Sequence, residues 1–451
     1  SAASDVYKRQ GIPIVKSKPH HHRNQWLGRG SIATLLVAAW MALAAGCMFG
    51  ELKRELAEKD NSFGLKGRVV GIARAQGDVF VLLYAKQGET LQLIRYALPD
   101  NNGNFSFIVT PGTYLLAGVE DLNGNQRHDP GEPTGAWGQP DDIVVKSLAK
   151  GETRPAGWSV LNLQLAPGEF PLVGVDTSVG TVAEMPAAQI NRGQLARWDD
   201  PMFDDEQGVT GLGRPMTFLR THGAGVYFMV PFDRKKIPIL FVHGAGGTPR
   251  PWQPMAESLD PDRFQPWVVY YPSGMRLNQI ANGLNQIVKQ LQLDYKFDRM
   301  GVVAHSMGGL VARAFILKHL IDDGLGTVRA FVSISAPWGG VRMAAQGVER
   351  APQAIPSWHD VAPQSGFIET IFADSLTPQV PNYLLFSFRG DRSRFMANND
   401  GVVEIASQLD LRAQDDALRV RGLDETHVGI LASEAAIAFV NEALAASFAQ
   451  P

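Results

Sequence analysis

The chain has 451 residues, of which 45% are hydrophobic and 19% charged, and its 42 basic and 45 acidic side chains give a formal charge of -3. An apolar-rich chain with few charges does not fit a disordered protein, and its balanced charge offers no basic surface for nucleic acid. This length predicts a globular protein of about two domains. The single cysteine, Cys47, excludes an internal disulfide.

The amino terminus predicts a targeting segment rather than part of the fold. Residues 1–10 resemble the translation of a sequencing adaptor fused to a reading frame, so we exclude them from fold reasoning. A basic stretch then precedes residues 30–50, which carry no charge. A basic region followed by an apolar one is typical of a secretory signal.

The end of that segment reads Leu-Ala-Ala-Gly-Cys at residues 43–47, which resembles a bacterial lipoprotein signal. The resemblance implies that residues 11–47 form a lipoprotein-type signal and that the protein is tied to a membrane of the cell envelope through a lipidated Cys47. By the same resemblance, Met48 rather than Asp after the cysteine implies the outer rather than the inner membrane of a Gram-negative cell. An uncleaved anchor helix is the alternative, because 21 uncharged residues can just span a bilayer.

Short apolar runs separated by turn residues follow the charged residues 51–62, which we expect to be a spacer. Closely spaced strands without a helical stretch predict a small β-sandwich module over residues 64–148. Within it, residues 112–125 resemble immunoglobulin-like and prealbumin-like modules of secreted bacterial proteins. The strands are expected at 67–72, 79–85, 90–97, 104–109 and 112–120.

A loop of this module has the spacing of a calcium loop, in which oxygen ligands alternate and a terminal Glu chelates the ion. Gln126 stands where such a loop has Gly, and no helical pattern flanks it, so an ordinary tight loop is the alternative to a structural calcium site. The candidate ligands at positions 1, 3, 5, 9 and 12 are Asp121, Asn123, Asn125, Asp129 and Glu132.

The carboxyl-terminal half alternates strand and helix patterns, which predicts an α/β domain over residues 216–451. Its apolar runs lack polar alternation, as in a mostly parallel sheet covered on both faces by helices. Residues 149–215 are rich in Gly, Pro and Ala and are expected to connect the domains, and residues 341–381 are expected to be an insertion that could cover a site. The strands are expected at 226–230, 237–242, 267–271, 300–304, 330–335, 383–388 and 418–423.

Ser306 lies between an apolar strand and a helix in the run Ala-His-Ser-Met-Gly-Gly, residues 304–309. This run resembles the nucleophile elbow of the α/β hydrolases, Gly-x-Ser-x-Gly, with Ala304 replacing the first glycine. Small residues are needed because the serine occupies a strained turn close to neighbouring backbone. The resemblance implies an α/β-hydrolase fold and a serine hydrolase similar to lipases and esterases. A serine that caps a helix beside packing glycines is the alternative.

An acyl-transfer site also needs two donors for the oxyanion. The amide of Met307, at the start of the helix, can supply one. The run Phe-Val-His-Gly-Ala-Gly-Gly at residues 241–247 resembles the oxyanion loop of lipases, which implies the Ala245 amide as the second donor. His243 precedes the nucleophile, so we interpret it as shaping this loop rather than as the base.

In α/β hydrolases the acid and the base follow the serine in that order. His427, after the last expected strand, matches the base, whereas His319 and His359 lie away from strand ends. Asp400 resembles the acid of the lipase Asp-Gly-x-Val signature. Asp391 lies nearer its strand and is the rival acid.

These residues predict a serine hydrolase that cleaves carboxylic esters, lipid or other acyl esters, through an acyl-enzyme and without a catalytic cofactor. Trp338, Met307 and Phe367 are candidates for an apolar acyl pocket or for ordinary core packing. An acyltransferase that uses the same residues, and a non-catalytic surface scaffold, remain alternatives.

Overall fold

The computed structural model describes residues 49–71, 77–99, 103–137, 142–146, 158–179, 190–390 and 398–449. The adaptor-like residues, the signal segment with Cys47, and Asp391 lie outside these residues. No helix within the described ranges is both long enough and apolar enough to cross a membrane.

The described chain begins with a helix over residues 49–60, where the sequence predicted a spacer. Leu52 is fully buried, and Glu55, one turn later on the same face, is 7% exposed. The Glu55 carboxylate accepts a hydrogen bond of 2.6 Å from the Met216 amide in the first turn of α3, Pro215–Thr221. First-turn amides have no partner within their own helix, so this helix caps α3 and belongs to the fold.

Two sheets without intervening helices follow, one in the order β4-β1-β8 and one in the order β3-β2-β5-β6-β9, with β7 pairing to β5. Leu65 and Phe107 of the first sheet share a buried hydrophobic cluster with Val81 and Leu116 of the second. The strands are β1 Phe63–Val70, β2 Asp78–Gln87, β3 Thr90–Ala97, β4 Asn104–Val109, β5 Gly112–Asp121, β6 Pro133–Trp137, β7 Ile143–Val145, β8 Trp158–Gln164 and β9 Ala166–Pro167.

A third sheet of eight strands runs in the order β10-β11-β13-β12-β14-β15-β16-β17. All neighbouring strands are parallel except β11 and β13, so the sheet is mixed, and the one antiparallel pair is compatible with the expectation of a mostly parallel sheet. Only residues 229–236 separate β11 from β12, without a helix, so the chain turns back instead of crossing over. The strands are β10 Ile190–Leu195, β11 Ala224–Phe228, β12 Ile237–Val242, β13 Phe264–Tyr270, β14 Met300–His305, β15 Val328–Ile334, β16 Asn382–Ser387 and β17 Arg419–Leu423.

The interval 149–215 was expected only to connect domains, but it contributes regular elements to both. β8 pairs in parallel with β1, and β10 pairs with β11 at the edge of the large sheet. α2, Asp205–Gly213, also falls within this interval. Gly- and Pro-rich composition hides these elements because it lacks a hydrophobic period.

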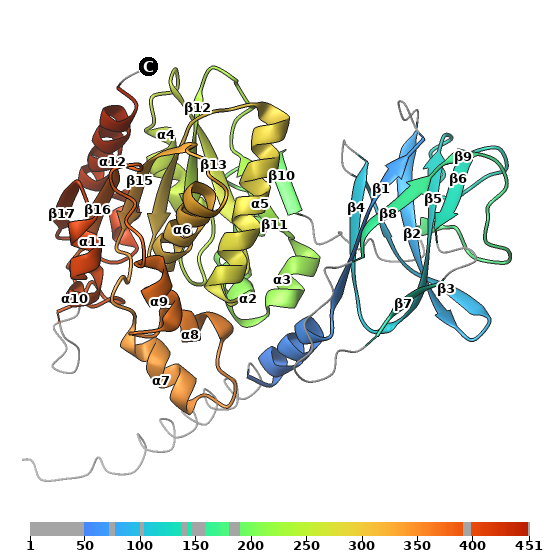
Figure 1. The fold of residues 1–451 in the computed structure, drawn as a ribbon, viewed down its shortest axis with the longest axis horizontal. Coiled ribbons are helices and arrows are strands. Elements are labelled where there is room, and N and C mark those ends of the chain that lie inside the picture. Colours follow the sequence, from blue (N-terminus) through green and yellow to red (C-terminus); the bar gives the residue numbers. More distant parts are fainter. Residues whose placement is uncertain are drawn as a thin grey trace, which may run out of the picture. The chain divides into compact units, whose positions relative to one another are not determined.

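Helices cover both faces of the large sheet, and Figure 1 shows α5 and α6 lying across one of them. Leu240 and Val242 of β12 face the cluster that contains α5 and α6, whereas Ile239 and Phe241 face the cluster that contains α4 and α12. The remaining helices are η2 Pro201–Phe203, η3 Arg250–Trp252, α4 Gln253–Glu257, α5 Leu277–Tyr295, α6 Met307–Leu317, the π-helical turn η4 Lys318–Asp322, α7 Arg342–Arg350, α8 Pro356–Val361, α9 Gly366–Ile371, α10 Ile405–Gln408, α11 Leu411–Asp415, η5 Gly429–Ala432 and α12 Glu434–Ser447.

The insertion 341–381 carries α7, α8 and α9, and two arginines hold it, one through an ion pair and one through a hydrogen bond to its backbone. Asp360 of α8 pairs with Arg276 at 2.7 Å. Arg313 of α6, 2% exposed, pairs with Asp416 at 2.5 Å and donates to the carbonyl of Ile371 at 2.6 Å. The end of the insertion is therefore fastened to the helix that follows Ser306.

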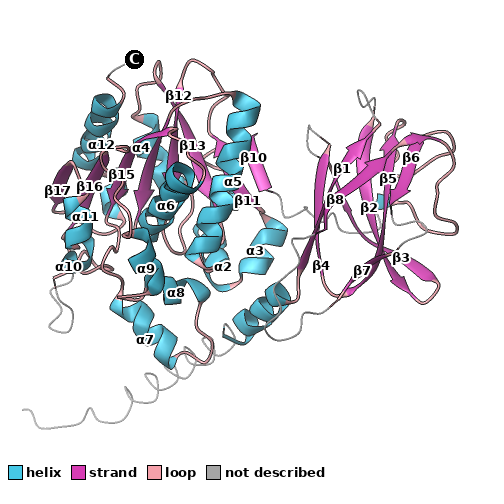
Figure 2. Ribbon diagram, viewed as in Figure 1, coloured by secondary structure: helices cyan, strands magenta, loops and turns pink. Residues whose placement is uncertain are grey.

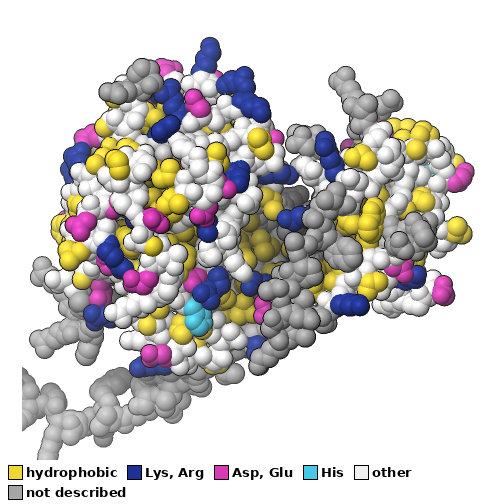
Figure 3. All heavy atoms as spheres, in the orientation of Figure 1, with side chains coloured by type: hydrophobic (Ala, Val, Ile, Leu, Met, Phe, Trp, Pro, Cys, Tyr) yellow, Lys and Arg dark blue, Asp and Glu magenta, His cyan; other side chains and the backbone are white. Residues whose placement is uncertain are grey.

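Figure 2 shows the helices gathered around the eight-stranded sheet. On the face drawn in Figure 3, acidic and basic side chains are interspersed among apolar ones. This mixture agrees with the balanced composition.

Candidate active site

Ser306 forms a strained turn between β14 and α6, with φ of 55° and ψ of -134°. Positive φ is uncommon for a residue with a side chain, and such strain gathers at functional sites. A Cβ at Gly308 would lie 2.4 Å from the carbonyl oxygen of His243, so only glycine fits there. Ala304, which replaces the first glycine of the elbow pattern, fits fully buried in β14.

The structure brings Ser306, His427 and Asp400 together. His427 Nε2 lies 2.9 Å from Ser306 Oγ, and His427 Nδ1 lies 2.7 Å from Asp400 Oδ2. The three side chains are 9%, 6% and 0% exposed, respectively. With Nδ1 donating to the carboxylate, Nε2 is the acceptor that faces the serine hydroxyl.

Several neutral donors surround the Asp400 carboxylate. Oδ1 accepts from the Val402 and Val403 amides at 3.0 and 2.8 Å, and Oδ2 accepts from Ser387 Oγ at 2.6 Å and Gln408 Nε2 at 3.0 Å. Burial by itself raises the pKa of the Asp400 carboxyl, but the hydrogen bond and charge of His427 and the Ser387 hydroxyl hold it below its ordinary value. Sequence reasoning missed Ser387 and Gln408, which carry no motif.

The two predicted oxyanion donors belong to segments next to the serine. Met307 opens α6 directly after it, and Ala245 follows Gly244, whose position would put a Cβ 3.2 Å from Ser306 Oγ. Among the described residues, neither the Met307 nor the Ala245 amide has a hydrogen-bond acceptor. The Gly246 amide, one residue later, donates to Ser273 Oγ at 2.8 Å.

His243 contacts the oxyanion loop rather than the serine. Its Nδ1 lies 2.8 Å from the carbonyl oxygen of Gly244, and its ring stacks on Tyr271 with centroids 4.2 Å apart. Burial lowers the pKa of His243 to about 4. A neutral ring whose Nδ1 donates to Gly244 fits a loop-shaping role.

His305, which sequence reasoning missed, contacts the backbone of the base, His427. Its Nε2 donates to the carbonyl oxygen of His427 at 2.7 Å, and the two rings lie 4.7 Å apart. Burial and the neighbouring His427 lower the pKa of His305 to about 3, which keeps it neutral. The other candidates lie elsewhere: His319 bonds Asn285 at 2.9 Å, and His359 is exposed on α8.

Trp338, Met307 and Phe367 all belong to the hydrophobic cluster on the α5 and α6 side of the sheet. Trp338 is 2% exposed and packs edge-on against Phe372, with centroids 5.7 Å apart. These contacts are those of core residues, and a role in binding an acyl chain stays a prediction.

In the candidate calcium loop, the carboxylates accept hydrogen bonds from amide groups of the loop itself. Asp121 Oδ1 accepts from the Gly124 amide at 2.7 Å, Glu132 Oε2 accepts from the Asp129 amide at 2.9 Å, and Asn123 donates to the Asp129 carboxylate at 2.7 Å. Within the described ranges, no group of three or more His, Cys, Asp or Glu residues is arranged to hold a metal ion. Calcium binding stays a prediction.

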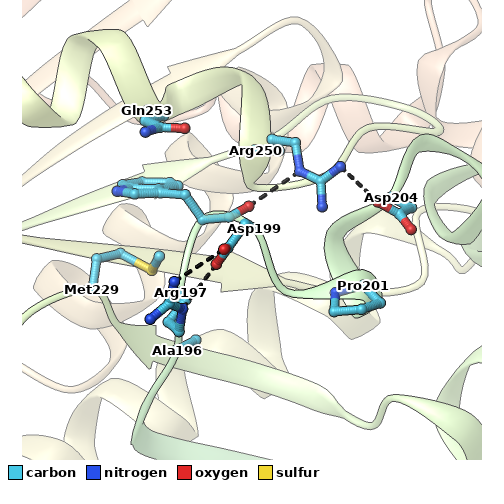
Figure 4. A pocket seen from close by; sticks show the side chains of 9 residues that line it. Ala196, Arg197, Asp199, Pro201, Asp204, Met229, Arg250 and Gln253 are labelled. Carbon is cyan, nitrogen blue, oxygen red and sulfur yellow. Dashed lines mark hydrogen bonds and ion pairs between the residues drawn. The ribbon is translucent and has the colours of Figure 1, made fainter.

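A pocket of about 720 Å³ lies at another place in the α/β domain, and no residue of the Ser306 site lines it. Figure 4 shows its charged side chains paired with one another. Arg250 lies 2.6 Å from Asp204, and Arg197 lies 2.9 Å from Asp199. Each charged side chain that lines this pocket therefore has an oppositely charged partner within it.

Comparison with known proteins agrees with this fold. The family model described as alpha/beta hydrolase of unknown function (DUF915) matches residues 274–358, which include Ser306. None of the curated proteins compared with the chain matches it. With the sheet and the elbow, this match supports the α/β-hydrolase superfamily.

Solved structures overlap the chain weakly. The product of gene lin2722 from Listeria innocua is 18% identical, covering 46% of this chain and 94% of its own, with a TM-score of 0.36. Bacillus licheniformis lipase BlEst2 in mature form is 16% identical, covering 46% and 92%, with a TM-score of 0.37. Aspergillus fumigatus lipase B is 19% identical, covering 49% and 56%, with a TM-score of 0.37. Overlaps this weak say nothing of what this chain acts on.

Proposed function

We propose that this protein is a serine hydrolase of carboxylic esters, with Ser306 as nucleophile, His427 as base and Asp400 as the acid that orients the base. The observation that carries the proposal is the continuous set of hydrogen bonds, 2.9 Å and 2.7 Å, from the serine through the histidine to the carboxylate. Its location at a strained strand-to-helix turn is the context in which such a serine is reactive.

The reaction follows from this geometry. His427 Nε2 takes the Ser306 hydroxyl proton while Oγ bonds to the acyl carbon, and the carbonyl oxygen becomes an oxyanion. The amides of Ala245 and Met307 stabilise that oxyanion. The intermediate collapses as the C–O bond to the alcohol breaks, and His427 gives its proton to the leaving alcohol. Water then attacks the acyl-enzyme with His427 again as base, which releases the acid and regenerates Ser306.

The substrate class and the location of the protein are part of the same proposal. The lipoprotein-type sequence around Cys47 supports anchoring in a bacterial cell envelope, where lipid and other acyl esters are at hand. In cells given a labelled fatty acid, the wild-type protein should take up the label and Cys47→Ser should not. A wild-type protein without label would contradict lipid anchoring.

The hydrolase proposal is tested with the full chain and chromogenic esters of increasing acyl length. Ser306→Ala should lower kcat/KM by a factor of about 1000 or more, the scale measured when a triad residue is removed. Ser447→Ala, the same change on α12, is the matched control and should keep full activity.

Equal turnover by the wild type and Ser306→Ala would contradict Ser306 as nucleophile. A Ser306-dependent burst of alcohol without release of acid would instead favour transfer of the acyl group to an acceptor other than water.

A further inference from the structure

The buried hydrogen bonds at the active site continue past Asp400. Ser387 Oγ at the end of β16 lies 2.6 Å from Asp400 Oδ2, the same oxygen that faces His427. Ser335 Oγ, after β15, lies 2.6 Å from Ser387 Oγ. Asp400 and both of these serines are fully buried. The ends of two neighbouring strands therefore present hydroxyl groups behind the carboxylate.

Gln408, the last residue of α10, fixes this arrangement with both ends of its amide. Its Oε1 accepts from the Ser387 amide at 3.0 Å, and its Nε2 donates to the Ser387 carbonyl oxygen at 3.1 Å. Nε2 also lies 3.0 Å from Asp400 Oδ2. The side chain is 1% exposed, so water does not compete for these bonds.

The surroundings of Asp400 suit a carboxylate and leave its negative charge unneutralised. Each hydrogen bond that a described residue makes to its two oxygens comes from a neutral amide or hydroxyl group or from His427. Within the described residues, no Lys or Arg forms an ion pair with Asp400. Among the described residues that contact Asp400, His427 alone can gain a positive charge, and it does so when it takes the serine proton.

We propose that Gln408 and Ser387 are positioning residues, which hold Asp400 Oδ2 toward His427 by neutral donors and so keep the full carboxylate charge for the imidazolium that forms during catalysis. This inference rests on the proposed function. A cation in their place would neutralise the carboxylate before the reaction begins, and an apolar group would leave Oδ2 with fewer donors in a buried site.

The test measures the effect of Gln408→Met on kcat and KM in the wild-type chain and in an Asp400→Asn chain. This substitution keeps the length of the side chain and removes its amide. In the otherwise wild-type chain, kcat should fall by about ten- to a hundredfold, the scale seen for partners that orient an active-site group, while KM stays within about twofold. In an Asp400→Asn background, Gln408→Met should cause little further loss, because it acts through Asp400.

Equal losses in both backgrounds, or an unchanged kcat in the single variant, would overturn the proposal. If Gln408→Met does not fold, Ser387→Ala, a smaller change that removes one donor to the same oxygen, takes its place in the same cycle with the same expectations.

A second measurement does not depend on turnover. The proton between His427 Nδ1 and Asp400 Oδ2 should give a far-downfield proton NMR signal that is absent from His427→Ala. Gln408→Met should shift or broaden this signal, and an unchanged signal would overturn the proposal even if no ester is hydrolysed. If the wild-type protein hydrolyses no ester but Gln408→Met changes the NMR signal as expected, the result contradicts the proposed function and leaves the positioning roles of Gln408 and Ser387 standing.

Discussion

Four buried histidines of the α/β domain differ in what their ring nitrogens contact. His427 faces the serine, His243 bonds the oxyanion loop, His305 bonds the backbone of His427, and His319 bonds an asparagine. The sequence distinguishes His427 as the base because it follows the last strand. The roles of the other three depend on contacts that only the folded structure shows.

His243 sets the direction of one oxyanion donor. A trans peptide points its carbonyl oxygen and its amide proton in opposite directions, so a bond to the Gly244 oxygen orients the Ala245 amide. His243→Phe keeps a ring against Tyr271 but removes the donor, and kcat should fall by about ten- to a hundredfold, somewhat less than loss of a whole oxyanion donor.

His243→Asn, which retains a side-chain donor near Gly244, is the matched variant and should lose less activity. Steady-state kinetics with one chromogenic ester measures both. If His243→Phe kept full activity, the Ala245 amide would be oriented by other groups.

The sequence predicted those site residues that lie in a recognisable motif or chain order. Ser306 lies in the nucleophile-elbow motif, and Asp400 and His427 follow later strands in the expected order. Ser387, Gln408 and His305 have no such context, because hydroxyl, amide and imidazole groups are common and only the fold brings them to Asp400 and His427.

At the scale of elements, the helix over residues 49–60 was expected to be a spacer because charged residues dominate its sequence. Leu52 is its one buried apolar side chain, and Phe49 and Leu56, at helical spacing from it, are only partly buried, so the apolar face is short. The Glu55 carboxylate that caps α3 is 161 positions away in sequence from its partner Met216. Long-range caps of this kind have no local signature.

Glu55→Gln should lower the free energy of unfolding by about 1–2 kcal/mol, the usual value of a helix cap. A carboxylate that accepts amide protons is replaced by an amide that offers only one acceptor atom. Chemical denaturation of the full chain measures the loss.

Glu51→Gln on the same helix is the control for Glu55→Gln. Glu51 is half-exposed and 3.9 Å from Arg214, so its loss should stay within about 0.5 kcal/mol. Equal effects of the two substitutions would mean that Glu55 does not cap α3.

Another element, α2, packs closely on the oxyanion loop. A Cβ at Gly208 would lie 2.4 Å from the carbonyl oxygen of Gly246. Gly208→Ala should therefore displace the loop and lower kcat by about tenfold or more, as small misplacements at active sites do.

Gly283→Ala is the control for Gly208→Ala, because no atom lies within 4 Å of a Cβ at that position of α5. It should keep full activity and raise stability by up to about 1 kcal/mol, the helix-propensity difference between the two residues. An active Gly208→Ala protein would show that the loop tolerates the contact.

For the whole molecule, burial of neutral histidines makes stability depend on pH. Burial lowers the pKa from 6.5 to about 4 for His243 and His319 and to about 3 for His305. Because these folded-state values lie below the unfolded-state value, stability is complete above about pH 6.5 and is lost as pH falls toward 4.

At pH 5 each of these histidines should lower the free energy of unfolding by on the order of 2 kcal/mol relative to pH 7.5. Urea unfolding at the two pH values measures the difference, and His319→Gln should reduce it by about one third. A free energy of unfolding that is the same at both pH values would contradict neutral burial.

The order of strands and helices in the α/β half was predictable because long apolar runs and amphipathic helices repeat there. The antiparallel pairing of β11 with β13 and the contributions of residues 149–215 were not, since strand direction follows from the length of connections rather than from side-chain pattern.

The most direct test of the central claim is covalent capture of Ser306. The full chain, treated with a fluorophosphonate, should gain one phosphonyl group, which peptide mass spectrometry should find on Ser306, and His427→Ala should react far more slowly. A folded wild-type protein that does not react, or a Ser306→Ala protein that reacts at the same rate, would contradict a serine nucleophile activated by His427.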